Sequence, residues 1–227
     1  MKKILIIAAH PDDDILGCGG LISKYQSKGV TFKILFIGEG STCRFEDPGS
    51  KEAKSEIEKR NLSALNALKY LKVKDIEFSN LPCGRFDQIP IIEINKIIEK
   101  NIDSFAPDTV LTHSPTDANN DHKIVFNATI MATRPVASNH VKTLMSFEIL
   151  SSSEWAYIDT FKPNYFEELD ESHIESKCHA LSIYESEIKD FPFPRSNEGI
   201  KAIAMMRGMQ SGFKYAEAFN LIRIFKK

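Results

Sequence analysis

The sequence predicts an α/β protein in which a mostly parallel sheet carries helices on both faces. The first observation is an unbroken apolar run over residues 3–9, typical of a strand buried on both faces of a parallel sheet. Apolar residues then recur at helical spacing from Ile15 to Gln26, and Gly29 fits the end of that helix. A second strand is predicted over residues 31–37, with sequence Thr-Phe-Lys-Ile-Leu-Phe-Ile. Strand, helix and strand in this order form a βαβ unit, which predicts a three-layer, Rossmann-like architecture.

The same alternation continues beyond this first unit. Residues 38–50 contain Gly, Ser, Thr, Asp and Pro, a composition that predicts a loop. The segments that follow are predicted, in chain order, as helix 51–71, strand 76–78, helix 91–105, strand 109–112, helix 122–133 and strand 145–150. Strands that alternate with helices in this way are expected to join one parallel sheet.

The last third of the chain, residues 151–227, is less regular. It has helical patterns near 173–188 and 197–210, separated by the rigid connection Phe191-Pro-Phe-Pro-Arg195. Internal repeats, low-complexity tracts and linkers are absent from the sequence, so we expect a single domain over residues 1–227. The last third is expected to contribute to the pocket or to contacts between subunits, and a homo-oligomer is compatible with the sequence.

Composition and charge exclude several classes of protein. The chain has 227 residues, of which 42% are hydrophobic and 26% charged, as in ordinary soluble proteins. Its net charge is -2, whereas nucleic-acid-binding proteins are typically basic, so no nucleic-acid partner is expected. No stretch approaches the roughly 20 apolar residues that a membrane span needs, so no span is expected.

The N-terminus and the cysteines predict a cytoplasmic location. The apolar run at residues 3–9 stops at His10 and meets three aspartates, which a signal peptide would not do. The four cysteines have no C-x-x-C spacing and are expected to be reduced thiols; they are Cys18, Cys43, Cys83 and Cys178.

The first group of residues with chemical potential is His10-Pro11-Asp12-Asp13-Asp14. It follows the first predicted strand, at the sheet edge where open α/β folds bind ligands. Acids at this point can also be explained as the cap and first turn of the next helix. That explanation accounts for one or two of the aspartates but not for the histidine. It also leaves like charges repelling each other, which a divalent cation would relieve.

The second group runs from His113 to His122, with sequence His-Ser-Pro-Thr-Asp-Ala-Asn-Asn-Asp-His. It follows another predicted strand, so both groups are expected at the same edge of the sheet. Two histidines and a carboxylate, with one position left for water, are typical ligands of a catalytic zinc site. A further carboxylate beside that water can act as general base.

These two motifs resemble the LmbE-like, PIG-L-type N-deacetylases. The resemblance rests on His-Pro-Asp-Asp and the glycine-rich segment that follows it, and on the later pair Asp121-His122. Weaker points of similarity are Gly38 to Ser41, a helix bearing Arg60, Phe161 to Tyr165 and Tyr215 to Phe219. The resemblance therefore spans nearly the whole chain. It implies a hydrolase that removes an N-acetyl group from a small N-acylated amino sugar, usually with zinc.

The resemblance also implies roles for individual residues. His10, Asp13 and His122 correspond to the metal ligands, and Asp12 corresponds to the general base on the attacking water. Zinc is the expected cation, with another divalent metal such as Fe²⁺ as the alternative. An arginine that holds the substrate is best matched by Arg60.

The catalytic set departs from the family pattern at one position. Many members have His-Pro-Asp-His where this chain has Asn119-Asn-Asp121-His122, and the first histidine there is thought to stabilise the oxyanion. Asn119 can still donate to an oxyanion, or His113 can fill that role. Asn119, His113 and Asp121 are therefore catalytic candidates beside Asp12.

Two other activities were weighed against hydrolysis. His10, Asp12 and His122 satisfy the two-histidine, one-carboxylate formula of non-haem iron oxygenases, although those enzymes are typically all-β. A catalytically inactive sugar-binding module is the third alternative. Arg44, in a loop at the expected rim, is a candidate for substrate contact or for solvated surface. His140, His173 and His179 lie away from both groups and are not expected to be catalytic.

Overall fold

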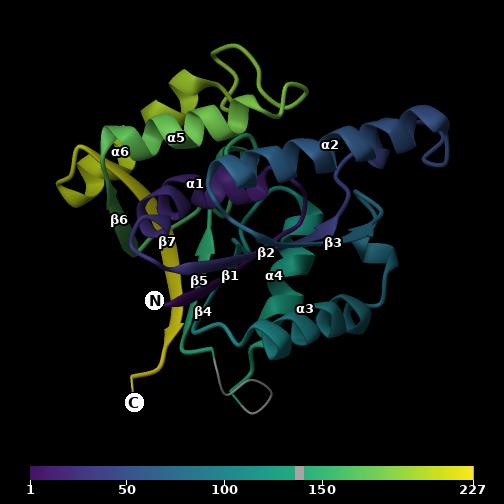
Figure 1. The fold of residues 1–227 in the computed structure, drawn as a ribbon, viewed down its shortest axis with the longest axis horizontal. Helices are drawn as coiled ribbons and strands as arrows, with labels where there is room; N and C mark the ends of the chain where they lie inside the picture. Colours follow the sequence, from purple (N-terminus) through teal and green to yellow (C-terminus); the bar gives the residue numbers. More distant parts are fainter. Residues whose placement is uncertain (136–140, 227) are drawn as a thin grey trace.

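The computed structural model describes residues 1–135 and 141–226, and in that part of the chain seven strands form one sheet of order β3-β2-β1-β4-β5-β7-β6 (Figure 1). The strands are β1 (Lys3–Ala8), β2 (Thr31–Gly38), β3 (Asp75–Leu81), β4 (Thr109–His113), β5 (Thr143–Phe147), β6 (Tyr165–Leu169) and β7 (Tyr215–Ile224). Neighbours among β1 to β5 pair in parallel, whereas β7 is antiparallel to both β5 and β6. The expected mostly parallel sheet is confirmed. His140 lies outside the described residues.

Helices cover both faces of the sheet, as Figure 1 shows. One face carries α1 (Asp13–Gln26), α2 (Lys51–Tyr70), α5 (Glu171–Ser182) and α6 (Asn197–Ser211), and the other carries α3 (Ile91–Phe105) and α4 (Asn120–Ala132). Side chains of β1 alternate between the two cores: Ile4 and Ile6 pack on the first face, Leu5 and Ile7 on the second. Both faces of β1 are buried, which explains the unbroken apolar run at residues 3–9. Among the described residues, no helix is long and apolar enough to cross a membrane.

The strand order places the two polar groups side by side. β1 pairs with β2 on one side and with β4 on the other, and the connecting helices change face between these neighbours. At such a switch point a crevice opens at the carboxyl ends of the strands. His10 follows β1 and His113 ends β4, so both groups lie together at these strand ends.

The structure corrects the description of the last third of the chain. The pattern near 173–188 is helical only as far as Ser182, and β6 and β7 were both missed. β7 pairs with β5, so the C-terminal segment completes the same sheet. Smaller corrections concern strand ends: β5 covers 143–147 instead of 145–150, and β3 extends over 75–81.

The glycines of α1 allow the helix to lie close to the sheet. A Cβ atom on Gly17 would stand 2.4 Å from the ring of Phe147 on β5. We expect Gly17→Ala to lower the free energy of unfolding by about 1–2 kcal/mol, because overpacking outweighs the roughly 1 kcal/mol gained in helix propensity. Urea unfolding measures this. Gly49→Ala, in an exposed loop, is the control with a change within about 0.5 kcal/mol. An equal loss in both variants would contradict the packing argument.

Candidate active site

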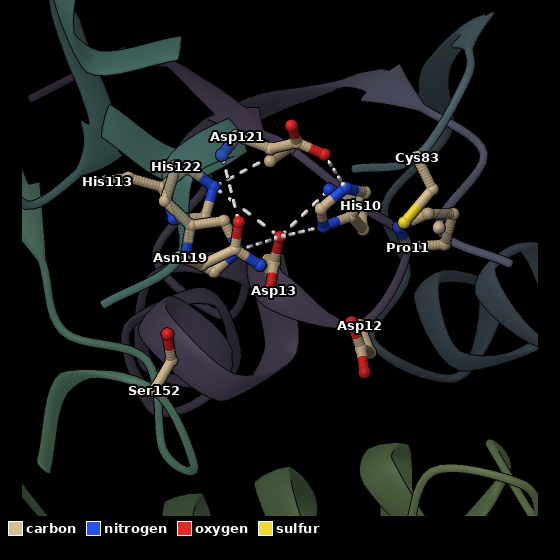
Figure 2. Close-up of polar contacts among 12 residues, drawn as sticks. His10, Pro11, Asp12, Asp13, Cys83, His113, Asn119, Asp121, His122 and Ser152 are labelled. Atoms are coloured by element: carbon tan, nitrogen blue, oxygen red, sulfur yellow. Dashed lines mark hydrogen bonds and ion pairs between the residues drawn. The ribbon is translucent and has the colours of Figure 1, made fainter. Parts of the chain in front are cut away.

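Three buried side chains converge where β1 and β4 end. Asp13 Oδ2 lies 3.7 Å from His10 Nδ1 and 3.4 Å from His122 Nε2 (Figure 2). One ligand atom from each residue lies within 4.8 Å of the other two. His10 comes directly after β1, Asp13 opens α1, and His122 lies in the first turn of α4. Residues more than a hundred positions apart thus form one cluster.

Two further carboxylates fix the orientation of the histidine rings. Asp121 Oδ2 lies 3.0 Å from His10 Nε2 and accepts a 2.6 Å hydrogen bond from the Gly84 amide. Asp117 Oδ1 lies 3.2 Å from His122 Nδ1. The other ring nitrogens, His10 Nδ1 and His122 Nε2, face Asp13, and a cation held there would take the place of the His122 proton that Asp13 and Asp117 stabilise. Such carboxylate–histidine pairs are the usual support of metal ligands.

The electrostatics of the cluster fit a cation. Burial alone would lower the pKa of His122, but the carboxylates of Asp13 and Asp117 raise it to about 10. Burial alone would raise the pKa of Asp13, but His122, His113 and His10 hold it well below its usual range. Tetrahedral zinc with nitrogen and oxygen ligands places those atoms about 3.3 Å apart, close to the 3.4 and 3.7 Å seen around Asp13 Oδ2. The donor set therefore suits zinc.

Asp12 lies apart from the cluster (Figure 2), and two arginines hold its carboxylate. Its Oδ1 accepts a 3.0 Å hydrogen bond from Arg60 and its Oδ2 a 2.7 Å bond from Arg195. Its side chain makes no cap hydrogen bond to α1, which argues against the capping explanation. With φ at 113° it occupies the left-handed region, a strained state that is typical of functional sites. Complete burial raises the pKa of Asp12 despite both arginines, which strengthens this carboxylate as a base.

Glu187 connects the arginines around Asp12. Its carboxylate accepts hydrogen bonds of 2.7 and 2.9 Å from Arg44, and further bonds from Arg60 and Arg195, both of 2.9 Å. Burial alone would raise the pKa of Glu187, but the three guanidinium groups lower it to about 2. Arg60 also donates to the backbone oxygens of Pro11 and Gly40. The donors of Arg60 therefore face the protein, whereas the Arg44 side chain is 46% exposed.

Asn119 and His113 differ in their exposure to solvent. His113 is fully buried, accepts a 2.8 Å hydrogen bond from the Ala9 amide at Nε2, and stacks on His122. Burial lowers the pKa of His113 to about 3, so the ring is neutral. Asn119 is half-buried, and its Oδ1 caps α4 by accepting from the Asp121 amide at 2.9 Å. That bond leaves Nδ2, with its two hydrogens, as the donor end of the side chain.

A match to a protein-family model shows which family the chain belongs to. A family model described as PIG-L, GlcNAc-PI de-N-acetylase, matches residues 5–133, more than half of the sequence. The chain belongs to the PIG-L family. The matched region contains both polar groups, so the resemblance inferred from His-Pro-Asp-Asp and Asp-His is confirmed.

Known proteins resemble this PIG-L protein along its whole length. Diacetylchitobiose deacetylase from Thermococcus kodakarensis is 27% identical over 232 residues, 98% of this chain and 84% of the relative. The structure of N,N'-diacetylchitobiose deacetylase from Pyrococcus horikoshii has a TM-score of 0.78 at 23% identity, covering 98% of this chain and 84% of that one. The fold is confirmed by this likeness.

The same fold also supports different chemistry. The structure of GalB, the 4-carboxy-2-hydroxymuconate hydratase from Pseudomonas putida KT2440, has a TM-score of 0.75 at 20% identity, covering 100% of this PIG-L chain and 99% of the hydratase. Because one fold hosts several activities, the reaction has to be argued from the site itself.

The structure brings together most of the residues that the sequence singled out in this PIG-L protein. The cluster contains His10, Asp13, His113, Asn119, Asp121 and His122. Arg60 and Arg44 do not reach this cluster and contact Glu187 instead. The roles of three residues were not predicted from the sequence: Asp117, Glu187 and Arg195. Asp117 had one available signal, its place within the second polar group; the other two had none.

Asp117 is expected to support the affinity of this site for a cation. We expect Asp117→Asn to weaken zinc binding by about 10–100-fold, because a neutral amide stabilises His122 less as a ligand. Chelator competition measures the dissociation constant, with the exposed Asp159→Asn as the charge-matched control. Unchanged zinc affinity in a folded Asp117→Asn protein would show that Asp117 does not support cation binding.

Proposed function

We propose that this protein is a zinc-dependent N-deacetylase that hydrolyses the acetamido group of a small amino sugar or sugar conjugate. The observation that carries the proposal is the convergence of His10, Asp13 and His122 beside a separate, buried carboxylate, Asp12. Membership of the PIG-L family supports it, as does the similarity to a deacetylase of diacetylchitobiose.

The three residues His10, Asp13 and His122 would hold the cation. Zinc is proposed, with Fe²⁺ as the alternative, because imidazole and carboxylate ligands suit both. A divalent cation held by these residues would lower the pKa of a bound water and polarise an amide carbonyl. Asp121 and Asp117 keep the two imidazole rings in the tautomers that the ligands need.

The chain's own groups supply the proton transfers and the oxyanion contact. Asp12 takes a proton from the attacking water and returns it to the amine nitrogen as the C–N bond breaks. Arg60 and Arg195 hold the Asp12 carboxylate in place, so we assign Arg60 to positioning and not to the substrate. Asn119 Nδ2 donates to the developing oxyanion, because buried His113 already uses Nε2 on the Ala9 amide.

The side chains around Asp12 come from both ends of the chain. Glu187 and Arg195 belong to the last third, yet they contact Arg60 and Asp12. We therefore propose that residues 1–227 work as one domain. Arg44, which is half-exposed, is the proposed contact for the substrate.

The alternative activities have less support from the geometry. An oxygenase site of His10, Asp12 and His122 would need Asp12 beside both histidines, but the carboxylate that lies 3.7 Å from His10 and 3.4 Å from His122 is Asp13. The described residues include all three candidate ligands and the candidate base. A module that only binds sugar would not need this complete set.

Acetate release from N-acetylglucosamine, diacetylchitobiose and other N-acetylated sugars tests the proposal. We expect turnover that stops after chelation and returns with added zinc. The O-acetylated form of the best sugar is the matched control, and it separates amide hydrolysis from general esterase activity. Turnover that is unaffected by chelation, or absence of acetate from every N-acetylated sugar, would contradict the proposed function.

A further inference from the structure

A pair of cysteines lies next to the cluster and has no part in the proposed reaction. Cys43 lies in the 3₁₀ turn η1 (Thr42–Arg44) after β2, and Cys83 lies in the turn after β3. Their Sγ atoms are 2.9 Å apart. Cys43 is exposed and Cys83 is buried. The two other cysteines, Cys18 and Cys178, are both buried in the core.

The surroundings make Cys43 the reactive member of the pair. The hydrogen bond from Cys83 lowers the pKa of the Cys43 thiol to about 6, with further help from the Arg44 guanidinium. The same bond, together with burial, raises the pKa of Cys83 above its usual range. An exposed thiolate beside a second thiol is the usual arrangement of an oxidisable pair, in which the second thiol resolves the first oxidation product.

The pair is connected to the cation ligands through Asp121. The Sγ atom of Cys83 lies within 4.8 Å of ligand atoms of His10 and Asp121, and Figure 2 shows it directed toward His10. The next residue, Gly84, donates its amide to Asp121 Oδ2 at 2.6 Å. Asp121 in turn orients His10. A movement of Cys83 would therefore displace the amide that holds Asp121.

We propose that Cys43 and Cys83 form a reversible oxidation site whose disulfide weakens the cation site through Gly84, Asp121 and His10. The consequence for the cation rests on the proposed function, whereas the cross-link itself does not. Closing the sulfur separation from 2.9 Å to a bond of about 2.05 Å moves the two turns toward each other. Disturbing an outer carboxylate of this kind typically costs about 10–100-fold in metal affinity.

The chemistry balances with hydrogen peroxide as the oxidant. The Cys43 thiolate attacks one peroxide oxygen, the O–O bond breaks, and hydroxide leaves, so that Cys43 becomes a sulfenic acid. Cys83 sulfur then attacks the Cys43 sulfur, the S–O bond breaks, and the released hydroxide takes the Cys83 proton to form water. Two thiols lose two electrons to one peroxide. A dithiol reductant reverses the reaction by thiol–disulfide exchange.

Peroxide treatment of the purified, zinc-loaded full chain tests the proposal with two measurements. Peptide mapping without reduction is expected to show one linked pair, Cys43 with Cys83. Chelator competition is expected to show zinc binding weakened by about 10–100-fold, restored after dithiothreitol. Neither measurement needs a substrate, so failure of the deacetylase assay is distinguishable from failure of this proposal.

Two variants serve as controls. Cys43→Ser should keep its zinc affinity under the same treatment, because no disulfide can form. Cys178→Ser, at a buried core cysteine of α5, should respond as the unaltered protein does. The proposal is overturned if no Cys43–Cys83 peptide forms, if it forms without a change in zinc affinity, or if Cys43→Ser loses zinc equally.

Discussion

Asp12→Asn is expected to lower kcat for acetate release by roughly 10²–10⁴-fold while zinc stays bound. The side chain is completely buried, and its carboxylate is held by hydrogen bonds from Arg60 and Arg195. An amide of the same shape keeps an oxygen for one arginine but cannot take a proton from water. Loss of the base without loss of the cation is therefore the expected result.

Measurement of zinc content and of kcat on the same preparation separates these two roles. Thermal unfolding should accompany them, because the variant weakens one of the two carboxylate contacts of a guanidinium and leaves only Glu187 as its charged partner. Asp159→Asn, an exposed carboxylate, is the control that removes equal charge. If Asp12→Asn and His122→Ala lost zinc to the same extent, the division between base and ligands would be wrong.

The arrangement at the carboxyl ends of β1 and β4 was accessible from the sequence because local patterns encode it. An apolar run buried on both faces marks β1, and strand order at the switch point then brings His10 and His122 together. The position of Asp13 toward the histidines, with Asp12 turned away, is not visible in the motif. It depends on the left-handed backbone at Asp12, which the arginines stabilise.

The residues that were missed act over long sequence separations. Arg195 contacts Asp12 across 183 positions, and neither residue carries a local signal of the other. β7 was missed for a related reason: Glu217 is buried within it and pairs with Lys177 at 2.7 Å. A buried acid interrupts the apolar pattern by which a strand is recognised, and its burial depends on a partner elsewhere in the chain.

His122→Ala is expected to reduce bound zinc to background and to abolish turnover with it. The change removes one of three proposed ligands, so its effect should exceed the roughly 10–100-fold expected for the supporting carboxylate Asp117. Asp117 keeps its contacts with Ser152 and Ser153, so its charge stays partly compensated and the fold is expected to persist.

Exogenous imidazole provides the sharpest test of His122 as a ligand, because it can occupy the space left by the side chain. Added imidazole should restore part of the zinc binding in His122→Ala. Asp12→Asn is expected to keep its zinc, and imidazole should not restore its activity. His179→Ala, at an exposed histidine of α5, is the control and should retain zinc and activity. Full zinc occupancy in a folded His122→Ala protein would mean that Asp13 and His10 bind the cation without it, and the cluster at the ends of β1 and β4 would need a different third ligand.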